Sequence, residues 1–436
     1  MMQPELLSPA GNLDAMRSAF AYGADAVYAG QPRYSLRVRN NAFDLATLAQ
    51  GIKEAHKLRK KFYVVSNIAP HNRKIDTLVD DLAEVIELSP DALIVSDPGV
   101  IMLLRRHFPE MPLHLSVQAN TINWAAVEFW QQQGIERVIL SRELGLDEIA
   151  EIRQRCPDME LEVFVHGALC MAYSGRCLLS GYFNKRDPNQ GACTNACRWQ
   201  YKASAATEDQ VGQLNPQPVL LEEPMRPGEY MPMDEDEHGS YIMNSKDLRA
   251  VQHVAALAAM GVHSLKIEGR TKTPYYVART AQVYRQAIDD AAAGRPFNTR
   301  LLHALEGMAN RGFTEGFLQR HRPQDTQNYA TSHSNGNQQL VATFTGKAKG
   351  NWVEAEVKNK FSLGDQLELM TPQGNHAWTL SSLSNAQRAP IEVAKGSGHQ
   401  VWLQLPAPAA TAKTQLKHAY LLRTDRVLDT LAVEAS

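Results

Sequence analysis

Four of the five cysteines in this sequence lie close enough together to bind a metal through their thiolates. Cys170, Cys177, Cys193 and Cys197 fall within 28 residues, with six, fifteen and three residues between successive cysteines. Zinc and iron–sulfur clusters both accept four cysteine ligands, but structural zinc sites favour tight pairs, and only the last two cysteines form one. The wider first pair suits the larger perimeter of a 4Fe-4S cluster. Four unrelated buried thiols are the simpler alternative, and their clustering argues against it.

A cysteine hydrolase is the second chemistry that these residues allow, with His166 activating Cys170 four residues later. Such a dyad needs two residues and leaves three clustered cysteines without a role. The fifth cysteine, Cys156, is expected on a helix away from the group, with a structural role. The zinc-protease motif His-Glu-x-x-His, the serine-hydrolase motif Gly-x-Ser-x-Gly and a P-loop are all absent from the sequence.

Eight short apolar strands, each followed by a turn and most by an amphipathic helix, are predicted in the first 295 residues. This arithmetic favours an α/β fold, a (β/α)8 TIM-like barrel. An open, doubly wound sheet is the alternative, but Ser8-Pro9-Ala10-Gly11 stands where a Gly-x-Gly-x-x-Gly turn would follow the first strand. The predicted strands cover residues 5–8, 26–29, 62–66, 92–96, 113–117, 137–141, 161–165 and 264–267, and helices are expected at 45–60, 124–133 and 275–293.

Polar residues stand at or just after the ends of these strands, where barrel enzymes build their active sites. Helix capping explains single Ser and Asp residues at such turns equally well. A carboxylate, an imidazole and an amide from different strands fit capping less well. The predicted catalytic residues are therefore Glu143, His166, Gln118 and Glu268.

The chain as a whole is almost neutral, with 45 Lys and Arg against 47 Asp and Glu. A nucleic-acid partner would therefore need local basic groups. Arg33, Arg37 and Arg39, with Tyr34 between them, form one such group after a strand end, suited to RNA or to a carboxylate cosubstrate. The predicted binding residues for a cofactor or cosubstrate are Arg33, Arg37, Arg270 and Lys266. No apolar run long enough to span a bilayer and no secretion signal are visible, so we expect a cytoplasmic protein.

Changes in composition and hydrophobic pattern along the chain predict a barrel domain, an insertion within it and a C-terminal domain. Residues 1–330 are predicted to form the barrel domain, with a cysteine-rich insertion at about 170–263 between the seventh and eighth strands. The acidic, Pro-rich middle of this insertion, 203–238, is expected to be a solvated loop, and Asn244 or Ser245 is expected to cap a helix. After a linker at 331–337, residues 338–425 are predicted to form a small β-barrel accessory domain, with turns at 347–350 and 372–374.

Several long motifs resemble those of the collagenase-like peptidase family U32. The stretch 162–180, Glu-Val-Phe-Val-His-Gly-Ala-Leu-Cys-Met-Ala-Tyr-Ser-Gly-Arg-Cys-Leu-Leu-Ser, is similar to the defining motif of that family. The companion motifs are Leu7-Ser8-Pro9-Ala10-Gly11, Asn244-Ser245-Lys246-Asp247-Leu248 and Lys266-Ile267-Glu268-Gly269-Arg270. The resemblance covers essentially the whole chain, including the C-terminal β domain.

The resemblance implies a tRNA-modifying enzyme that hydroxylates carbon five of the wobble uridine, giving 5-hydroxyuridine. It further implies a 4Fe-4S cluster on the four clustered cysteines, prephenate as cosubstrate, no requirement for molecular oxygen, and the tRNA anticodon loop as the macromolecular partner. The electron donor is unknown. Some relatives take a ligand from a cysteine farther downstream, but this chain has none after Cys197, which is therefore our fourth ligand. A peptidase and a non-catalytic, cluster-bearing RNA-binding protein remain the alternatives.

Overall fold

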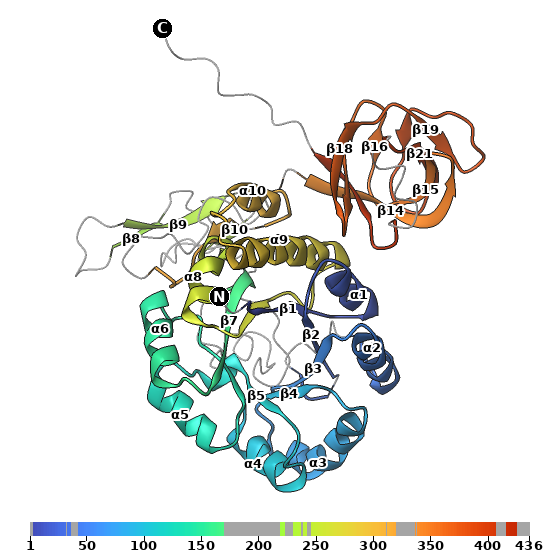
Figure 1. Cartoon of the computed structure of the whole chain (residues 1–436). Coiled ribbons are helices and arrows are strands. Elements are labelled where there is room, and N and C mark those ends of the chain that lie inside the picture. Colours follow the sequence, from blue (N-terminus) through green and yellow to red (C-terminus); the bar gives the residue numbers. More distant parts are fainter. Residues whose placement is uncertain are drawn as a thin grey trace, which may run out of the picture.

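The structure is a computed structural model that describes residues 3–31, 33–35, 42–169, 246–310, 312–319, 336, 338–406 and 416–424 with their side chains. It describes the backbone alone at 219–222, 230–236 and 239–241. Two bodies are visible, a ring of strands covered by helices and a smaller β domain beside it (Figure 1).

Eight parallel strands form a closed barrel, which confirms the predicted TIM-like fold. Each strand pairs with the next, and the pairing of β12 with both β7 and β1 closes the ring. All eight contain the core of a predicted strand. They are β1 (Glu5–Pro9), β2 (Ala26–Gly30), β3 (Lys61–Ser66), β4 (Ala92–Val95), β5 (Leu113–Leu115), β6 (Arg137–Ile139), β7 (Glu160–Ala168) and β12 (Ser264–Ile267).

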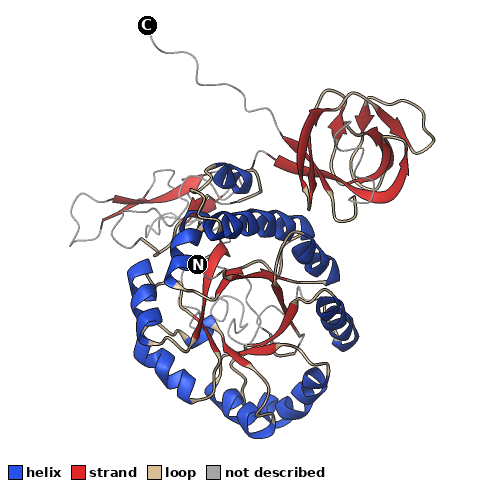
Figure 2. Ribbon diagram, viewed as in Figure 1, coloured by secondary structure: helices blue, strands red, loops and turns tan. Residues whose placement is uncertain are grey.

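Helices cover the outside of the barrel, as Figure 2 shows in blue around the red ring. Side-chain caps fix several of their starts: Asn12 accepts from the backbone N–H of Ala15, and Asp97 accepts from that of Val100. Asp97 therefore has the capping role that competed with a role in the site. The helices are α1 (Leu13–Ala21), α2 (Leu45–Lys57), α3 (Asn72–Glu87), α4 (Pro98–His107), α5 (Trp124–Gln132), α6 (Leu146–Arg155), α8 (Val254–Met260), α9 (Pro274–Ala292) and α10 (Arg300–Glu306), with 3-10 turns η2 (Val117–Ala119) and η5 (Val251–His253).

The described part of the insertion differs from the prediction in two places. The expected helix entry at 244–248 is wrong at its end, because Asp247–Arg249 form strand β11, antiparallel to the last residues of β7. β7 is longer than its neighbours, and β11 satisfies backbone groups that β7 would otherwise leave unpaired. The expected acidic loop is also wrong in part: β8 (Val219–Glu222), β9 (Tyr230–Asp236) and β10 (Gly239–Tyr241) form an antiparallel sheet. Backbone pairing overrides the acidic, Pro-rich composition that suggested a loop.

The C-terminal domain is a seven-stranded antiparallel sheet with a two-stranded companion and its own hydrophobic core. The turn predicted at 347–350 lies later, because the first strand continues through Lys349. β13 (Phe313–Thr314) precedes this domain and extends the barrel sheet beside β11. The strands of the domain are β14 (Gln338–Lys349), β15 (Trp352–Val357), β16 (Phe361–Ser362), β17 (Gln366–Thr371), β18 (Gly374–Thr379), β19 (Leu383–Asn385), β20 (Val393–Ala394), β21 (Gln400–Gln404) and β22 (Tyr420–Thr424).

Candidate active site at the C-terminal rim of the barrel

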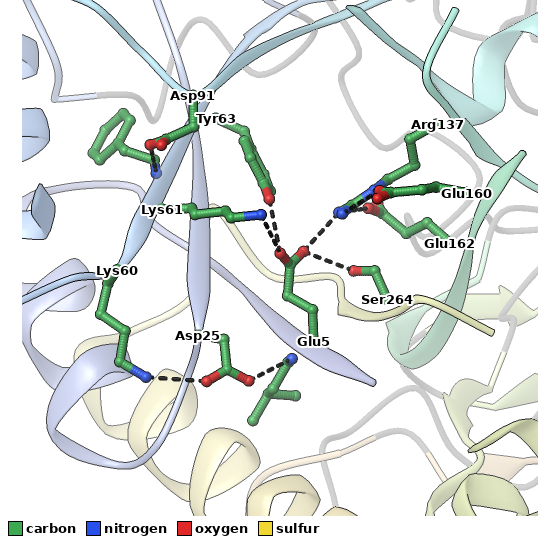
Figure 3. A network of polar contacts seen from close by, with 12 residues as sticks. Glu5, Asp25, Lys60, Lys61, Tyr63, Asp91, Arg137, Glu160, Glu162 and Ser264 are labelled. Atoms are coloured by element: carbon green, nitrogen blue, oxygen red, sulfur yellow. Dashed lines mark hydrogen bonds and ion pairs between the residues drawn. The ribbon is translucent and has the colours of Figure 1, made fainter. Parts of the chain in front are cut away.

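Ion pairs fill the N-terminal end of the barrel interior. The Glu5 carboxylate accepts from Arg137 Nη1 at 2.6 Å, from the Tyr63 hydroxyl at 2.8 Å and from the Ser264 hydroxyl at 3.1 Å, as Figure 3 shows. Arg137 also pairs with Glu160 at 2.7 Å and with Glu162 at 3.3 Å. Burial acts to lower the pKa of Arg137, but the carboxylates of Glu5 and Glu162 outweigh it and raise that pKa. This end of the interior is therefore occupied by charges that compensate one another.

Lys266, one of the predicted binding residues, belongs to this interior network. Its ammonium donates to Glu162 Oε1 at 2.7 Å, and both side chains are almost completely buried. The rings of Tyr28 and Phe164 lie 4.3 and 5.5 Å from the ammonium. Burial lowers the pKa of Lys266, and Glu162 opposes that shift. Lys266 therefore lies one layer below the rim, enclosed by aromatic rings and its carboxylate partner.

Arg142 and Glu268 meet at the C-terminal rim from the ends of β6 and β12. Their nearest charged atoms are 3.6 Å apart, and both side chains are mostly buried. Arg142 also donates to the backbone oxygen of Ala168 at 2.7 Å, and its guanidinium carbon lies 3.9 Å from the centre of the Phe164 ring. Glu268, a predicted catalytic residue, therefore lies at the rim as expected. Its partner Arg142 is not among the predicted site residues.

A second polar group lies at the ends of β3 and β5. The Gln118 side-chain oxygen accepts from the Ser116 hydroxyl and from the Asn67 amide. The third group follows β6, where the Ser141 hydroxyl donates to the Glu143 carboxylate. Gln118 and Glu143, both predicted catalytic residues, thus lie at the same end of the barrel as Glu268. Ser116 and Asn67 hold the Gln118 side chain, and Ser141 holds that of Glu143.

Arg270 lies beside a glycine that leaves room for it. Its Nη1 donates to the Ser35 hydroxyl at 2.6 Å, and the Tyr28 ring lies 5.6 Å from its guanidinium carbon. A Cβ at Gly30 would stand 2.2 Å from the Ser35 hydroxyl oxygen and 2.9 Å from Arg270 Nη1. Any side chain at position 30 would therefore displace this pair, so the glycine is needed for Arg270 to occupy the rim.

Arg33 is held at the outer edge of this end of the barrel. It pairs with Asp81 at 2.6 Å and donates to the Thr77 hydroxyl at 2.8 Å, both on α3. Its side chain remains half-exposed. Arg37, the neighbour with which it was grouped, lies outside the described residues, as does Arg39.

His166 does not join the rim. β7 gains one residue against β12 between Lys266 and Ile267, so His166 pairs with Ile267 and faces away from the interior. Its ring lies 5.5 to 5.9 Å from the rings of Tyr284 and Tyr276 on α9 and of Phe313 on β13. Burial lowers the pKa of His166 to about 3, which keeps the imidazole neutral near pH 7. Its catalytic role stays a prediction, and its surroundings favour a role in packing.

The four predicted cluster ligands, Cys170, Cys177, Cys193 and Cys197, lie outside the described residues. Cys156 follows the last turn of α6, is buried, and donates to the backbone oxygen of Trp124 at 3.5 Å, which agrees with the structural role expected of it. Among the described side chains, no group of three or more His, Cys, Asp and Glu is arranged to hold a metal ion. Over the same residues no helix has the length and apolar character that a membrane span requires.

Asn67 and Arg142 are among the polar residues that the sequence places at strand ends, but neither they nor Ser116 are among the predicted site residues. A usable signal existed, because each lies at or directly after the C-terminal end of a strand, as the predicted residues do. No periodicity in the sequence could show that Arg142 would pair with Glu268, since the two are brought together only by closure of the barrel.

Comparison with known proteins gives the relationship directly. The model of peptidase family U32 matches residues 11–328, and that of the family's C-terminal domain matches 336–423. The chain is 62% identical to "tRNA hydroxylation protein P" of Escherichia coli over 97% of both chains. It is 59% identical to the protein of the same name from Haemophilus influenzae, over 97% of this chain and 96% of that one. It is also 33% identical to "23S rRNA 5-hydroxycytidine C2501 synthase" of Escherichia coli, over 65% of this chain and 39% of that one. The chain therefore belongs to peptidase family U32.

Proposed function

We propose that this protein hydroxylates carbon five of the wobble uridine of tRNA, giving 5-hydroxyuridine. The observation that carries the proposal is the 62% identity, across almost the full length of both chains, to a protein named for tRNA hydroxylation. The more distant relative is named as a 5-hydroxycytidine synthase, and this name supports hydroxylation at carbon five of a pyrimidine ring. The reaction takes place in the cytoplasm under this proposal.

The rim offers the groups that such a reaction needs. A uracil ring held out of the stack presents one N–H donor and two carbonyl acceptors, which amide side chains such as Gln118 and Asn67 can bind. Replacement of the hydrogen on carbon five by a hydroxyl group is a two-electron oxidation, for which the cofactor and cosubstrate named below would have to supply the oxidising equivalents. The ring hydrogen leaves as a proton, which a carboxylate can accept. Glu143 and Glu268 are the rim carboxylates that we assign to this step, with Arg142 orienting Glu268.

The cofactors of the proposal are a 4Fe-4S cluster and prephenate. The support for the cluster is the donor set, four clustered cysteine thiolates, Cys170, Cys177, Cys193 and Cys197. When bound, such a cluster supplies redox chemistry, and the electron donor is a partner still to be found. Prephenate carries carboxylates, for which planar guanidinium groups are suitable partners. We assign Arg142 and Arg270 to this role as the guanidinium groups at the rim, where Arg142 also pairs with Glu268 and Arg270 donates to Ser35. Lys266 lies below the rim, paired with Glu162, and Arg33 lies at its outer edge, paired with Asp81.

Peptide hydrolysis is not favoured by the described residues. A thiol hydrolase would use His166 as its base, but that ring is 2% exposed and packs against α9 and β13. A group so placed cannot reach a substrate without a rearrangement of the barrel wall.

Nucleoside analysis of tRNA tests the proposal. A strain lacking the gene and any redundant hydroxylase should lose 5-hydroxyuridine and its derivatives, and the gene supplied on a plasmid should restore them. Glu143→Gln should restore much less, whereas Lys53→Gln, an exposed change on α2, should restore the wild-type level. In parallel, anaerobically purified protein should contain about four irons per chain, and Cys193→Ser should lose them. Unchanged 5-hydroxyuridine in the deletion strain would refute the function.

A further inference from the structure

The C-terminal domain is basic, although the whole chain is almost neutral. Residues 338–424 contain five acidic side chains, Glu354, Glu356, Asp365, Glu368 and Glu392. They contain nine basic ones, Lys347, Lys349, Lys358, Lys360, Arg388, Lys395, Lys413, Lys417 and Arg423. A positive excess gathered in one small domain is the electrostatic pattern expected of a surface that meets a polyanion.

One side of this domain is fixed against the barrel. Arg279 on α9 pairs with Glu368 on β17 at 2.7 Å, and the Arg279 side chain is 3% exposed. The Tyr22 hydroxyl on α1 lies within hydrogen-bond distance of the backbone oxygens of Met370 and His418, at 3.1 and 3.0 Å. This contact covers β17 and the start of β22 and sets the orientation of the domain. Figure 1 shows β15, β19 and β21 on the side away from α1 and α9.

An arginine lies on a tryptophan ring on that far side. The Arg388 guanidinium carbon is 3.3 Å from the centre of the Trp402 ring, and Arg388 is exposed. Trp402 on β21 lies between Glu354 on β15 and Ser384 on β19 in the sheet. A guanidinium supported in this way presents hydrogen-bond donors for phosphate and a plane on which a nucleobase can stack.

Lysines lie at both ends of β15, the strand that pairs with β21, and Lys358 among them pairs with Glu356 at 2.6 Å. Lys347 and Lys349 lie on the last residues of β14, and Lys347 pairs with Glu354 at 3.0 Å. Lys358 follows the other end of β15, where Val357 exchanges backbone hydrogen bonds with Gly398 and His399 of the loop that begins at Lys395. Lys349 and Lys395 are exposed, and neither forms an ion pair with another described residue. Their charge is therefore available to a phosphate.

We propose that the face formed by β14, β15, β21 and β19 is a docking surface for the tRNA backbone, with Arg388 on Trp402 at its centre. This inference rests on the proposed function and adds to it that the RNA is held outside the barrel by a rigidly attached second domain. Binding through lysine–phosphate contacts releases counterions, so the affinity should fall steeply as the salt concentration rises.

Charge reversal tests the surface on the full chain. Lys349→Glu combined with Lys395→Glu should weaken binding of purified tRNA at least tenfold at about 100 mM salt and reduce the slope of log Kd against log salt by about one to two. The matched control is Lys53→Glu with Lys57→Glu, which makes the same charge change on exposed residues of α2 and should stay within about twofold of wild type. Melting curves of both variants check that the fold is intact.

Arg388→Lys separates stacking from charge. It keeps the cation but loses the planar guanidinium, so tRNA binding should weaken several-fold while the salt slope stays unchanged. Suppose the wild-type protein binds and hydroxylates tRNA. If the Lys349→Glu/Lys395→Glu variant and Arg388→Lys then both bind tRNA with wild-type affinity, the docking surface is overturned and the proposed function is not. A wild-type protein that neither binds tRNA nor restores 5-hydroxyuridine would overturn the proposed function instead.

Discussion

Replacement of Lys266 by methionine tests whether this lysine holds the barrel together or binds a cosubstrate. Its ammonium is the nearest partner of Glu162, at 2.7 Å, and Glu162 is completely buried. In Lys266→Met, Glu162 keeps only the longer contact to Arg137 at 3.3 Å. Removing one partner of a buried ion pair typically costs about 3 to 5 kcal/mol, because the remaining charge is desolvated without compensation.

The expected shift in melting temperature follows from the size of the barrel domain. An unfolding entropy of about 2.1 cal/mol/K per residue gives about 0.7 kcal/mol/K for a domain of roughly 330 residues. A loss of 3 to 5 kcal/mol therefore lowers the melting temperature by about 4 to 7 °C. Differential scanning calorimetry measures this directly. Lys53→Met, on the exposed face of α2, is the control and should change it by less than about 1 °C.

The double variant Lys266→Met with Glu162→Met completes the test. It removes both charges, and Arg137 still pairs with Glu5 and Glu160 at 2.6 and 2.7 Å, so it should melt above the single variant. If the double variant lost as much stability as Lys266→Met and Glu162→Met lose separately when added together, the pairing argument would be refuted. A Lys266→Met protein that melts like wild type but makes no 5-hydroxyuridine would refute it too, and would assign the lysine to binding.

Three further predictions concern His166, the rim and the domain contact. Wild-type protein should lose stability as the pH falls from about 6.5 to 3, because in this range the His166 side chain binds a proton in the unfolded chain but stays neutral in the fold, where its pKa is about 3. His166→Phe should reduce this loss. Melting temperatures measured across the range test it, and parallel curves for variant and wild type would contradict it. Arg142→Lys keeps the charge but cannot reproduce the guanidinium contacts to Glu268 and the Ala168 oxygen, so 5-hydroxyuridine should fall about tenfold with little change in melting temperature. Arg279→Ala leaves Glu368, which is mostly buried, without its cation, so limited proteolysis should separate the two domains faster than in wild type. An unchanged cleavage rate would show that the Tyr22 contacts are sufficient to hold the domain.

The barrel could be predicted because its strands are short apolar runs separated by polar turns. The continuous run Phe62-Tyr63-Val64-Val65 carries the signal of a strand covered on its outer face by helices. The strands at 219–222 and 247–249 are harder to predict. Val219-Leu220-Leu221 is a short apolar run, but it stands in a Pro-rich, acidic segment, and Asp247-Leu248-Arg249 has a single apolar residue. Each is short and depends on pairing with a partner, β9 or β7.

The sequence predicts at which strand ends the site residues lie, but not whether each side chain faces the barrel interior or its outer surface. Strict alternation from Glu162 and Phe164 places His166 toward the interior with Glu143 and Gln118. One extra residue in β7 reverses its direction, and such a bulge has no signature in a single sequence. Alternation does place Lys266 in the interior, but not its depth there, which depends on Glu162 from the neighbouring strand.

Several independent contacts fix the backbone of Glu268, and this bears on how the rim acts. The Tyr28 hydroxyl donates to the oxygen of Ile267 at 2.8 Å, and the Tyr276 hydroxyl donates to that of Glu268 at 3.0 Å. Gly167 contributes by lacking a side chain, since a Cβ there would lie 2.5 Å from the Glu268 oxygen. Burial raises the pKa of both tyrosines, so they stay neutral donors near pH 7. The barrel wall thus fixes the backbone position of Glu268. Its carboxylate is already held near Arg142, so no conformational entropy has to be lost to order it during the reaction.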